Sequence, residues 1–217
     1  MEKLVIFDLD GTLLNTIADL GNAANHTLAE LGLPQHTLDE YRLMVGNGMR
    51  KLIMRALPEH LAADETFVDN TLAAFLDYYA KHIDTYTKPY PGIPELVSAL
   101  AAQGCKLAIA SNKIQAGAEK LAQEFFPNIP FVAVMGNSPL YPLKPDAAVV
   151  EYIMQKAGTD RAHTIMVGDS GTDIQTARNA GIPVIAVSWG FRPRAELTSA
   201  DKIVDSASAI LIAATLL

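Results

Sequence analysis

The chain has 217 residues, of which 17 are Lys or Arg and 24 are Asp or Glu, so its formal net charge is −7. Half of the residues are hydrophobic and 19% are charged, a balance that supports a buried core and excludes a disordered chain or a coiled coil. The net negative charge disfavours broad electrostatic binding to nucleic acid or anionic lipid. We therefore expect no nucleic-acid and no membrane partner.

Cys105 is the only cysteine, which excludes an intramolecular disulfide and a cysteine-rich zinc site. A reducing compartment fits this composition. The apolar run before Asp8 is too short for a secretory signal, and no apolar stretch approaches the roughly 20 residues that span a bilayer. We expect a cytoplasmic protein that is a monomer or a homodimer.

Short apolar runs rich in β-branched residues alternate with helical patterns along most of the chain. The predicted strands are 4–7, 106–110, 131–135, 164–167 and 184–187. The predicted helices are 93–103, 114–125, 146–157 and 172–180, with a last one within 210–217. Strands that alternate with helices of roughly 10 to 15 residues indicate a parallel sheet covered on both faces. The predicted fold is a doubly wound α/β sheet.

One segment, 15–86, interrupts this alternation. It contains no convincing strand, whereas 17–31 and 67–83 have long helical periodicity. We interpret it as an α-helical domain inserted into the α/β core, which then consists of residues 1–14 and 87–217.

The first two candidate site residues follow the first predicted strand. Ligands of open parallel sheets bind beyond the carboxyl ends of the strands, and Asp8 and Asp10 stand at such an end. Their spacing of two places both carboxylates on one side if the extended conformation continues. An ordinary Asp-Gly turn that closes a strand, with Gly11 in it, explains the same residues equally well.

Other polar residues follow later strands. Ser111 and Asn112 could cap the next helix or hold a phosphate at its N-terminus. Asp173 stands three residues after Ser170, as in a capping box, but Asp169 is better explained as a metal ligand. Lys144 lies between two prolines, and a lone lysine in such a setting is usually solvated.

Because these signals fall at one edge of one sheet, we expect them to form a single site. Four carboxylates within a few ångströms require a cation or protonation, and oxygen ligands favour a hard ion. We therefore predict a Mg²⁺ site formed by Asp8, Asp10, Asp169 and Asp173. With Asp10 protonated, three carboxylates, one Mg²⁺ and Lys144 sum to zero charge, a setting in which a phosphate dianion can bind.

These motifs together resemble those of the haloacid dehalogenase-like hydrolases, which are mostly phosphatases that work through an aspartyl-phosphate. The resemblance covers the whole chain. The sequence 8–12 (DLDGT) resembles the nucleophile motif of the family, Ser111-Asn112 the second motif, Lys144-Pro145 the third, and 168–173 (GDSGTD) the acidic fourth. The chain departs from the common pattern at Asn15, where many members have Asp, and at Ala147, where many have a second proline.

The resemblance implies a role for each residue. Asp8 would attack phosphorus, and Asp10 would protonate the leaving alcohol and then activate water. The resemblance also implies that Mg²⁺ is held by Asp8, the Asp10 backbone carbonyl and Asp169, with Asp173 assisting directly or through water. Ser111, Asn112 and Lys144 would hold the phosphoryl oxygens.

The inserted helical segment resembles the small cap of one subgroup, and 45–50 (VGNGMR) resembles phosphoglycolate phosphatases. This implies a small phosphorylated metabolite, 2-phosphoglycolate above all, as substrate. Asn47, Gly48 and Arg50 are then candidates for substrate specificity, although a helical Arg-Lys pair at 50 and 51 is more often a solvated face.

Two alternatives remain: a sugar phosphomutase of the same fold, and a phospho-acceptor receiver-type signalling domain, which the helical insertion disfavours. A Rossmann dehydrogenase is disfavoured because Gly46-Asn47-Gly48 lies in a helical segment and not after a strand.

Overall fold

The structure, a computed structural model, describes residues 2–216 and divides the chain into two compact units. One is an α/β unit formed by Met1–Asn15 and Pro89–Leu217, and the other is a helical unit formed by Thr16–Lys88. The helical unit begins one residue later and ends two residues later than the insertion expected from the sequence. The chain passes between the units at two short strands, β2 (Leu14–Asn15) and β3 (Lys88–Pro89).

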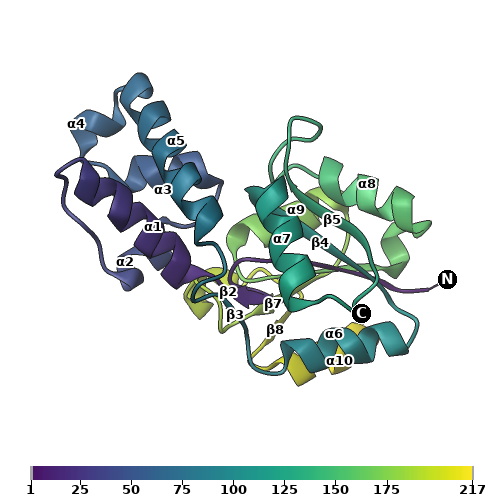
Figure 1. Ribbon diagram of the computed structural model, residues 1–217. Helices are drawn as coiled ribbons and strands as arrows, with labels where there is room; N and C mark the ends of the chain where they lie inside the picture. The colour runs from purple at the N-terminus through teal and green to yellow at the C-terminus, as the bar shows by residue number, and fades with distance from the viewer. Residues whose placement is uncertain (1, 217) are drawn as a thin grey trace. The chain divides into compact units, whose positions relative to one another are not determined.

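The described part of the α/β unit contains one six-stranded parallel sheet in the order β5-β4-β1-β6-β7-β8 (Figure 1). Its strands are β1 (Leu4–Phe7), β4 (Lys106–Ile114), β5 (Phe131–Asn137), β6 (Thr164–Gly168), β7 (Val184–Val187) and β8 (Lys202–Val204). The predicted parallel α/β fold is confirmed. β8 was not predicted, because three residues with an exposed lysine give too short an apolar run to recognise.

Helices cover both faces of this sheet. They are α6 (Ile93–Ala102), α7 (Gln115–Phe125), α8 (Ala148–Ala157), α9 (Gly171–Ala180) and α10 (Ala207–Leu216). Side chains alternate along a strand, so Leu4 and Ile6 of β1 face the core cluster that α8 and α9 complete. Figure 1 shows α6 and α10 together on the other face.

The local sequence accounts for where α9 begins and ends. The Ser170 hydroxyl accepts a hydrogen bond from the backbone N–H of Asp173, and the Asp173 carboxylate accepts one from the Ser170 N–H, which completes the predicted capping box. Gly181 ends the helix in the left-handed conformation that glycine adopts without a steric cost. This cap fixes Asp173 at the carboxyl edge of the sheet.

The end of β4 differs from its prediction. The strand continues beyond residue 110 through Ser111, Asn112 and Lys113. Helix α7 begins only at Gln115, and its N-cap residue is Ile114. Ser111 and Asn112 therefore do not cap the helix; they are strand residues in a stretch where the register with β5 shifts, between Ala110 and Ile114.

The helical unit contains α1 (Ile17–Glu30), α2 (Leu38–Met44), α3 (Met49–Ala56), α4 (Glu59–Ala62) and α5 (Glu65–Lys81). Its α1 packs against α5. The buried Asp19 carboxylate in the first turn of α1 accepts hydrogen bonds from the backbone N–H groups of Tyr86 and Thr87, at 2.8–3.0 Å. This contact fixes the start of α1 to the segment that leaves the unit.

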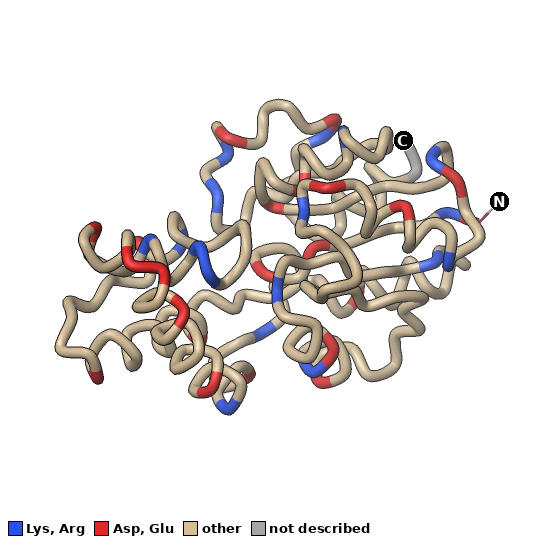
Figure 2. Tube along the Cα trace, turned by 90° about the horizontal axis from the view of Figure 1, so that it is seen from above, with Lys and Arg blue, Asp and Glu red and all other residues tan. Residues whose placement is uncertain are grey.

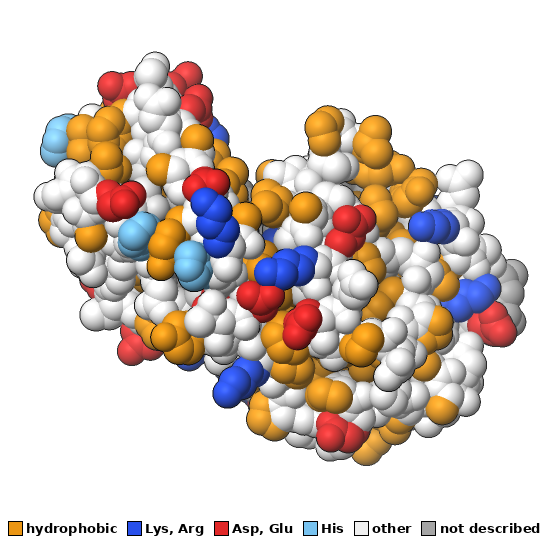
Figure 3. Space-filling view, viewed as in Figure 1, with side chains coloured by type: hydrophobic (Ala, Val, Ile, Leu, Met, Phe, Trp, Pro, Cys, Tyr) orange, Lys and Arg blue, Asp and Glu red, His pale blue; other side chains and the backbone are white. Residues whose placement is uncertain are grey.

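No helix in the described residues is long and apolar enough to cross a bilayer. Lys and Arg are spread along the chain and form no single basic stripe (Figure 2). The histidines visible in Figure 3 lie on the helical unit, where His26 and His82 stack on the ring of Tyr78.

Candidate active site

Asp8 continues the line of β1 into the site. Its backbone N–H donates to Val167 O of the neighbouring strand at 2.9 Å, and its carboxylate is almost completely buried. One carboxylate oxygen, Oδ1, accepts a hydrogen bond from the N–H of Leu9 at 2.7 Å. The chain then turns tightly, with Gly11 at φ 87° and its N–H bonded to Leu14 O. The turn and the site are thus formed by the same residues.

Lys144 is buried among carboxylates and is not solvated, as a lone lysine between two prolines usually would be. Its Nζ lies 3.0 Å from Asp8 Oδ1 and 2.7 Å from Asp173 Oδ1. Burial alone would lower the pKa of Lys144, but the charges of Asp173 and Asp8 raise that pKa above its ordinary value. Lys144 therefore remains a cation at the base of the site.

Asn112 holds the backbone of Lys144. Its side-chain Nδ2 donates to Lys144 O at 2.9 Å, and its Oδ1 accepts from the N–H of Lys144 at 2.8 Å. This reciprocal pair joins β4 to the loop before α8. The side-chain amide of Asn112 thus positions Lys144.

Asp169 and Asp173 enter from the turn between β6 and α9. The N–H of Phe191 donates to Asp169 Oδ2 at 2.7 Å. A Cβ at Gly190 or Gly11 would collide with the Asp169 carboxylate, so both glycines allow the backbone to enclose it. Asp173 is completely buried; its Oδ1 faces Lys144 and its Oδ2 accepts from the Ser170 hydroxyl at 2.6 Å.

Oxygen atoms of Asp8, Asp169 and Asp173 lie within 4.8 Å of one another. Burial, followed by the repulsion of neighbouring carboxylates, raises the pKa of Asp8 to about 7 and the pKa of Asp169 well above its ordinary value. A bound cation would reverse this effect, because positive charge favours the ionised acids. The all-oxygen donor set fits a hard divalent ion such as Mg²⁺.

Lys113 is a charged site residue that the sequence analysis missed. Its side chain is fully buried, and its Nζ lies 3.1 Å from Asp10 Oδ1 and 3.4 Å from Oδ2. The signal that could have revealed it is its spacing of two from Ser111, which places both on one side of an extended strand. Four carboxylates and two ammonium groups would sum to a charge of −2, which one divalent cation would neutralise.

Ser111 stands two residues beyond Ile109, which pairs with Phe7 of β1. It is buried, and its hydroxyl accepts the N–H of Lys113 at 3.3 Å. Its position on β4 brings it to the same sheet edge as Asp8.

The helical unit holds the other predicted residues. Gly46, Asn47 and Gly48 all have positive φ values and form a turn between α2 and α3, so they lie among helices and not after a strand. Arg55, which the sequence analysis missed, holds this turn through hydrogen bonds to Met44 O and Gly46 O. Arg50 is half-exposed, and its Nε lies 3.0 Å from Asp69 Oδ1.

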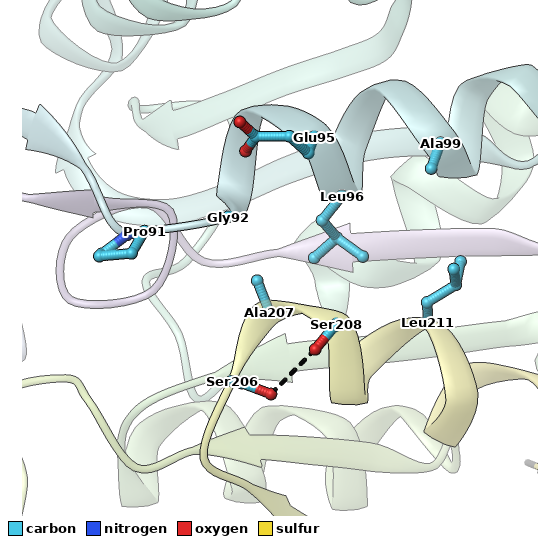
Figure 4. A pocket seen from close by; sticks show the side chains of 9 residues that line it. All are labelled: Pro91, Gly92, Glu95, Leu96, Ala99, Ser206, Ala207, Ser208 and Leu211. Atoms are coloured by element: carbon cyan, nitrogen blue, oxygen red, sulfur yellow. Dashed lines mark hydrogen bonds between the residues drawn. The ribbon is translucent and has the colours of Figure 1, made fainter.

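A cavity of about 320 Å³ lies between α6 and α10 (Figure 4). Its lining residues are Pro91, Gly92, Glu95, Leu96, Ala99, Ser206, Ala207, Ser208 and Leu211. None of these residues is a cation, and none belongs to the carboxylate cluster. The cavity therefore does not suit a phosphate, and the carboxylate cluster is the candidate active site.

Comparison with known proteins gives consistent matches. The sequence profile of a family described as haloacid dehalogenase-like hydrolase matches residues 5–187. A phosphoglycolate phosphatase of Agrobacterium fabrum is 37% identical over 97% of this chain and 91% of its own length. One from Mesorhizobium japonicum is 38% identical over 88% of this chain and 85% of its own.

A solved structure from Lactobacillus delbrueckii subsp. bulgaricus, for which phosphoglycolate phosphatase activity is proposed, superimposes with a TM-score of 0.91. It shares 33% identity, and the alignment covers 99% of each chain.

Proposed function

We infer that this chain, which belongs to the haloacid dehalogenase-like hydrolase family, is a phosphatase that hydrolyses a small phosphomonoester. The observation that carries this inference is the buried carboxylate of Asp8, held between Lys144 and the N–H of Leu9 beside the acidic pair from the β6–α9 turn. A carboxylate fixed in this way is a nucleophile for phosphorus, and its neighbours can bind the charge of a phosphoryl group.

The proposed reaction begins with attack of an Asp8 carboxylate oxygen on phosphorus. The bond from phosphorus to the substrate oxygen breaks, and the departing alkoxide takes a proton from Asp10. Water then attacks the resulting aspartyl-phosphate, gives a proton back to Asp10, and releases inorganic phosphate and free Asp8. This divides one difficult substitution into two easier steps.

Lys144 and Ser111 are the proposed contacts of the phosphoryl oxygens. The Lys144 ammonium already lies 3.0 Å from the Asp8 carboxylate, so it can follow charge as it moves onto the phosphoryl group. Asn112, which we predicted as a third contact, would act by holding Lys144 in place.

We propose Mg²⁺ as the metal, held by the carboxylates of Asp8 and Asp169 and the backbone carbonyl of Asp10. When bound, it would neutralise acids that otherwise repel a phosphate dianion. Both oxygens of Asp173 already have partners, Lys144 and Ser170, which favours a role for Asp173 in orienting the ligands through water.

Gly190→Ala tests the enclosure of Asp169. The new Cβ would displace the Asp169 carboxylate, so we expect the Mg²⁺ concentration for half-maximal activity to rise about 10-fold or more, as for other changes around metal ligands. Gly171→Ala is the matched control, because a Cβ there meets open space. A titration in which both variants match the wild type would show that this enclosure does not position the metal ligand.

We propose 2-phosphoglycolate as the substrate, which would yield glycolate and phosphate. The names of the relatives support this choice. The second carboxylate of such a substrate needs a cation or several N–H donors. In the helical unit, Arg50 and the turn at Asn47 and Gly48 offer both, and we propose these residues as the specificity determinants.

Arg50→Ala should raise KM for 2-phosphoglycolate about 10-fold to 100-fold, the value of one hydrogen bond between charged groups. KM for p-nitrophenyl phosphate, which has no second carboxylate, should stay unchanged. Asp69→Asn removes the ion-pair partner of Arg50 but leaves the positive charge of Arg50 in place. This variant should not raise KM for 2-phosphoglycolate. Equal effects of Arg50→Ala on both substrates would exclude Arg50 from the carboxylate-binding role.

The activity is tested by measuring phosphate release from a panel of phosphomonoesters with Mg²⁺. We expect kcat/KM for 2-phosphoglycolate to exceed that for sugar phosphates. Equal kcat/KM values would exclude 2-phosphoglycolate as the preferred substrate but would leave the phosphatase assignment in place. Isomerisation of a sugar phosphate with little phosphate release would identify a mutase, and a stable phospho-aspartate without turnover would identify a receiver-type domain.

We further propose that the protein acts in the cytoplasm, as its single cysteine suggests, and as a monomer or homodimer. Sedimentation equilibrium distinguishes these two oligomeric states.

A further inference from the structure

Lys113 is one of the largest completely buried side chains in the described residues. It is anchored on β4, and its Nζ contacts both oxygens of Asp10, at 3.1 and 3.4 Å. A buried ammonium is costly unless it is paired. Such a residue is easily replaced by an apolar one where stability alone matters, so its place beside Asp10 calls for another explanation.

Asp10 needs an external support. It lies beyond β1 in the turn that includes Gly11, where an isolated bridge pairs its backbone with Leu14. In the described part of the chain, its carboxylate has no hydrogen-bond or ion-pair partner other than Lys113. The direction of this carboxylate therefore depends on Lys113.

The two buried lysines serve different carboxylates. Lys144 contacts Asp8 and Asp173, whereas Lys113 contacts Asp10. Each acid with a proposed chemical role thus has its own ammonium group. The loss of Lys113 should then impair the proton transfers of Asp10 and spare the attack of Asp8 on phosphorus.

From this geometry we infer that Lys113 is a positioning residue that aims the Asp10 carboxylate at the leaving-group oxygen and later at the attacking water. The inference rests on the proposed phosphatase function and extends it to a residue outside the recognised motifs. The bidentate contact holds the plane of the carboxylate, as a fixed donor pair does in other oriented acids.

The test uses two substrates that differ in their need for a proton. The alkoxide of 2-phosphoglycolate needs protonation to leave, whereas p-nitrophenolate leaves without it. Lys113→Met should lower kcat for 2-phosphoglycolate about 10-fold to 100-fold, less than the full 10²- to 10⁴-fold contribution of an acid–base group. With p-nitrophenyl phosphate, rapid mixing should still show a first-turnover burst of p-nitrophenolate, followed by slow turnover, because only attack by water then needs Asp10.

Four further variants control the result. Lys113→Arg, which keeps two donors, should restore most of the activity. Lys106→Met removes a lysine from the other end of β4, where its Nζ binds Ala157 O, and should leave both rates unchanged. Asp10→Asn should show the same burst pattern, and Asp10→Asn combined with Lys113→Met should lose no more than Asp10→Asn alone.

Equal losses of the burst and of 2-phosphoglycolate turnover in Lys113→Met, or losses that add in the double variant, would overturn the positioning role. If Lys113→Met fails to fold, as judged by circular dichroism, Lys113→Gln carries the same comparison. A wild-type protein that hydrolyses neither substrate would overturn the proposed function itself, and the inference with it. The activity of the wild type thus separates failure of the function from failure of the inference.

Discussion

Asp8→Asn should abolish phosphate release, with kcat falling about 10⁴-fold or more, as in other enzymes that lose their nucleophile. The amide is nearly isosteric with the carboxylate but does not attack phosphorus. The fold should tolerate the change, because burial raises the pKa of Asp8 to about 7. The ionised form therefore destabilises the metal-free protein at neutral pH, and the melting temperature of metal-free Asp8→Asn should equal or exceed that of the wild type.

Asp77→Asn is the control for this substitution. Asp77 is an exposed helical residue that pairs with Lys81 at 2.8 Å, and its replacement should change neither activity nor folding. A residual rate above a few per cent in Asp8→Asn, with an intact circular dichroism spectrum, would show that Asp8 is not the nucleophile.

Removal of divalent cations with EDTA should abolish turnover, and Mg²⁺ should restore it. Without a cation, the four carboxylates of the site outweigh its two lysines and repel a phosphate dianion. Full activity in metal-free buffer would contradict this account of the site.

Thermal melting gives a second readout of metal binding. The pKa of Asp8 is raised in the folded protein, so its stabilising contribution is present below about pH 4 and is lost as the pH rises to about 7. Metal binding needs the ionised acid. The gain in melting temperature on addition of Mg²⁺ should therefore be larger at about pH 7.5 than at about pH 5.

The strands next to the site could be predicted because each is a continuous apolar run that ends at a polar turn. This pattern identified β1, β6 and β7 to within one residue. It could not show that β4 continues through Ser111, Asn112 and Lys113, because polar residues end the apolar run and the pairing of Ile114 with Asn137 of β5, after a register shift, is a tertiary contact. The capping interpretation of Ser111 was wrong for this reason.

The acidic residues of the candidate site could be predicted from the sequence, whereas the residues that hold its charged groups in position were harder to predict. Asp8, Asp169 and Asp173 follow strand ends that are visible in the sequence, and the structure brings them together. Lys113 contacts Asp10, which lies 103 positions away in the chain, and the amide of Asn112 contacts Lys144, which lies 32 positions away. Local sequence offers solvation or helix capping as adequate explanations for such residues, so only the tertiary structure reveals their partners.

The central claim is that phosphate passes through the Asp8 carboxylate. It is tested most directly by mixing the wild-type protein and Mg²⁺ with a phosphomonoester, quenching in acid within one turnover, and locating the added mass by peptide mass spectrometry. We expect one phosphoryl group on the peptide that contains Asp8, and none in Asp8→Asn. Phosphate on another residue, or turnover with no phosphorylated peptide at any time point, would contradict it.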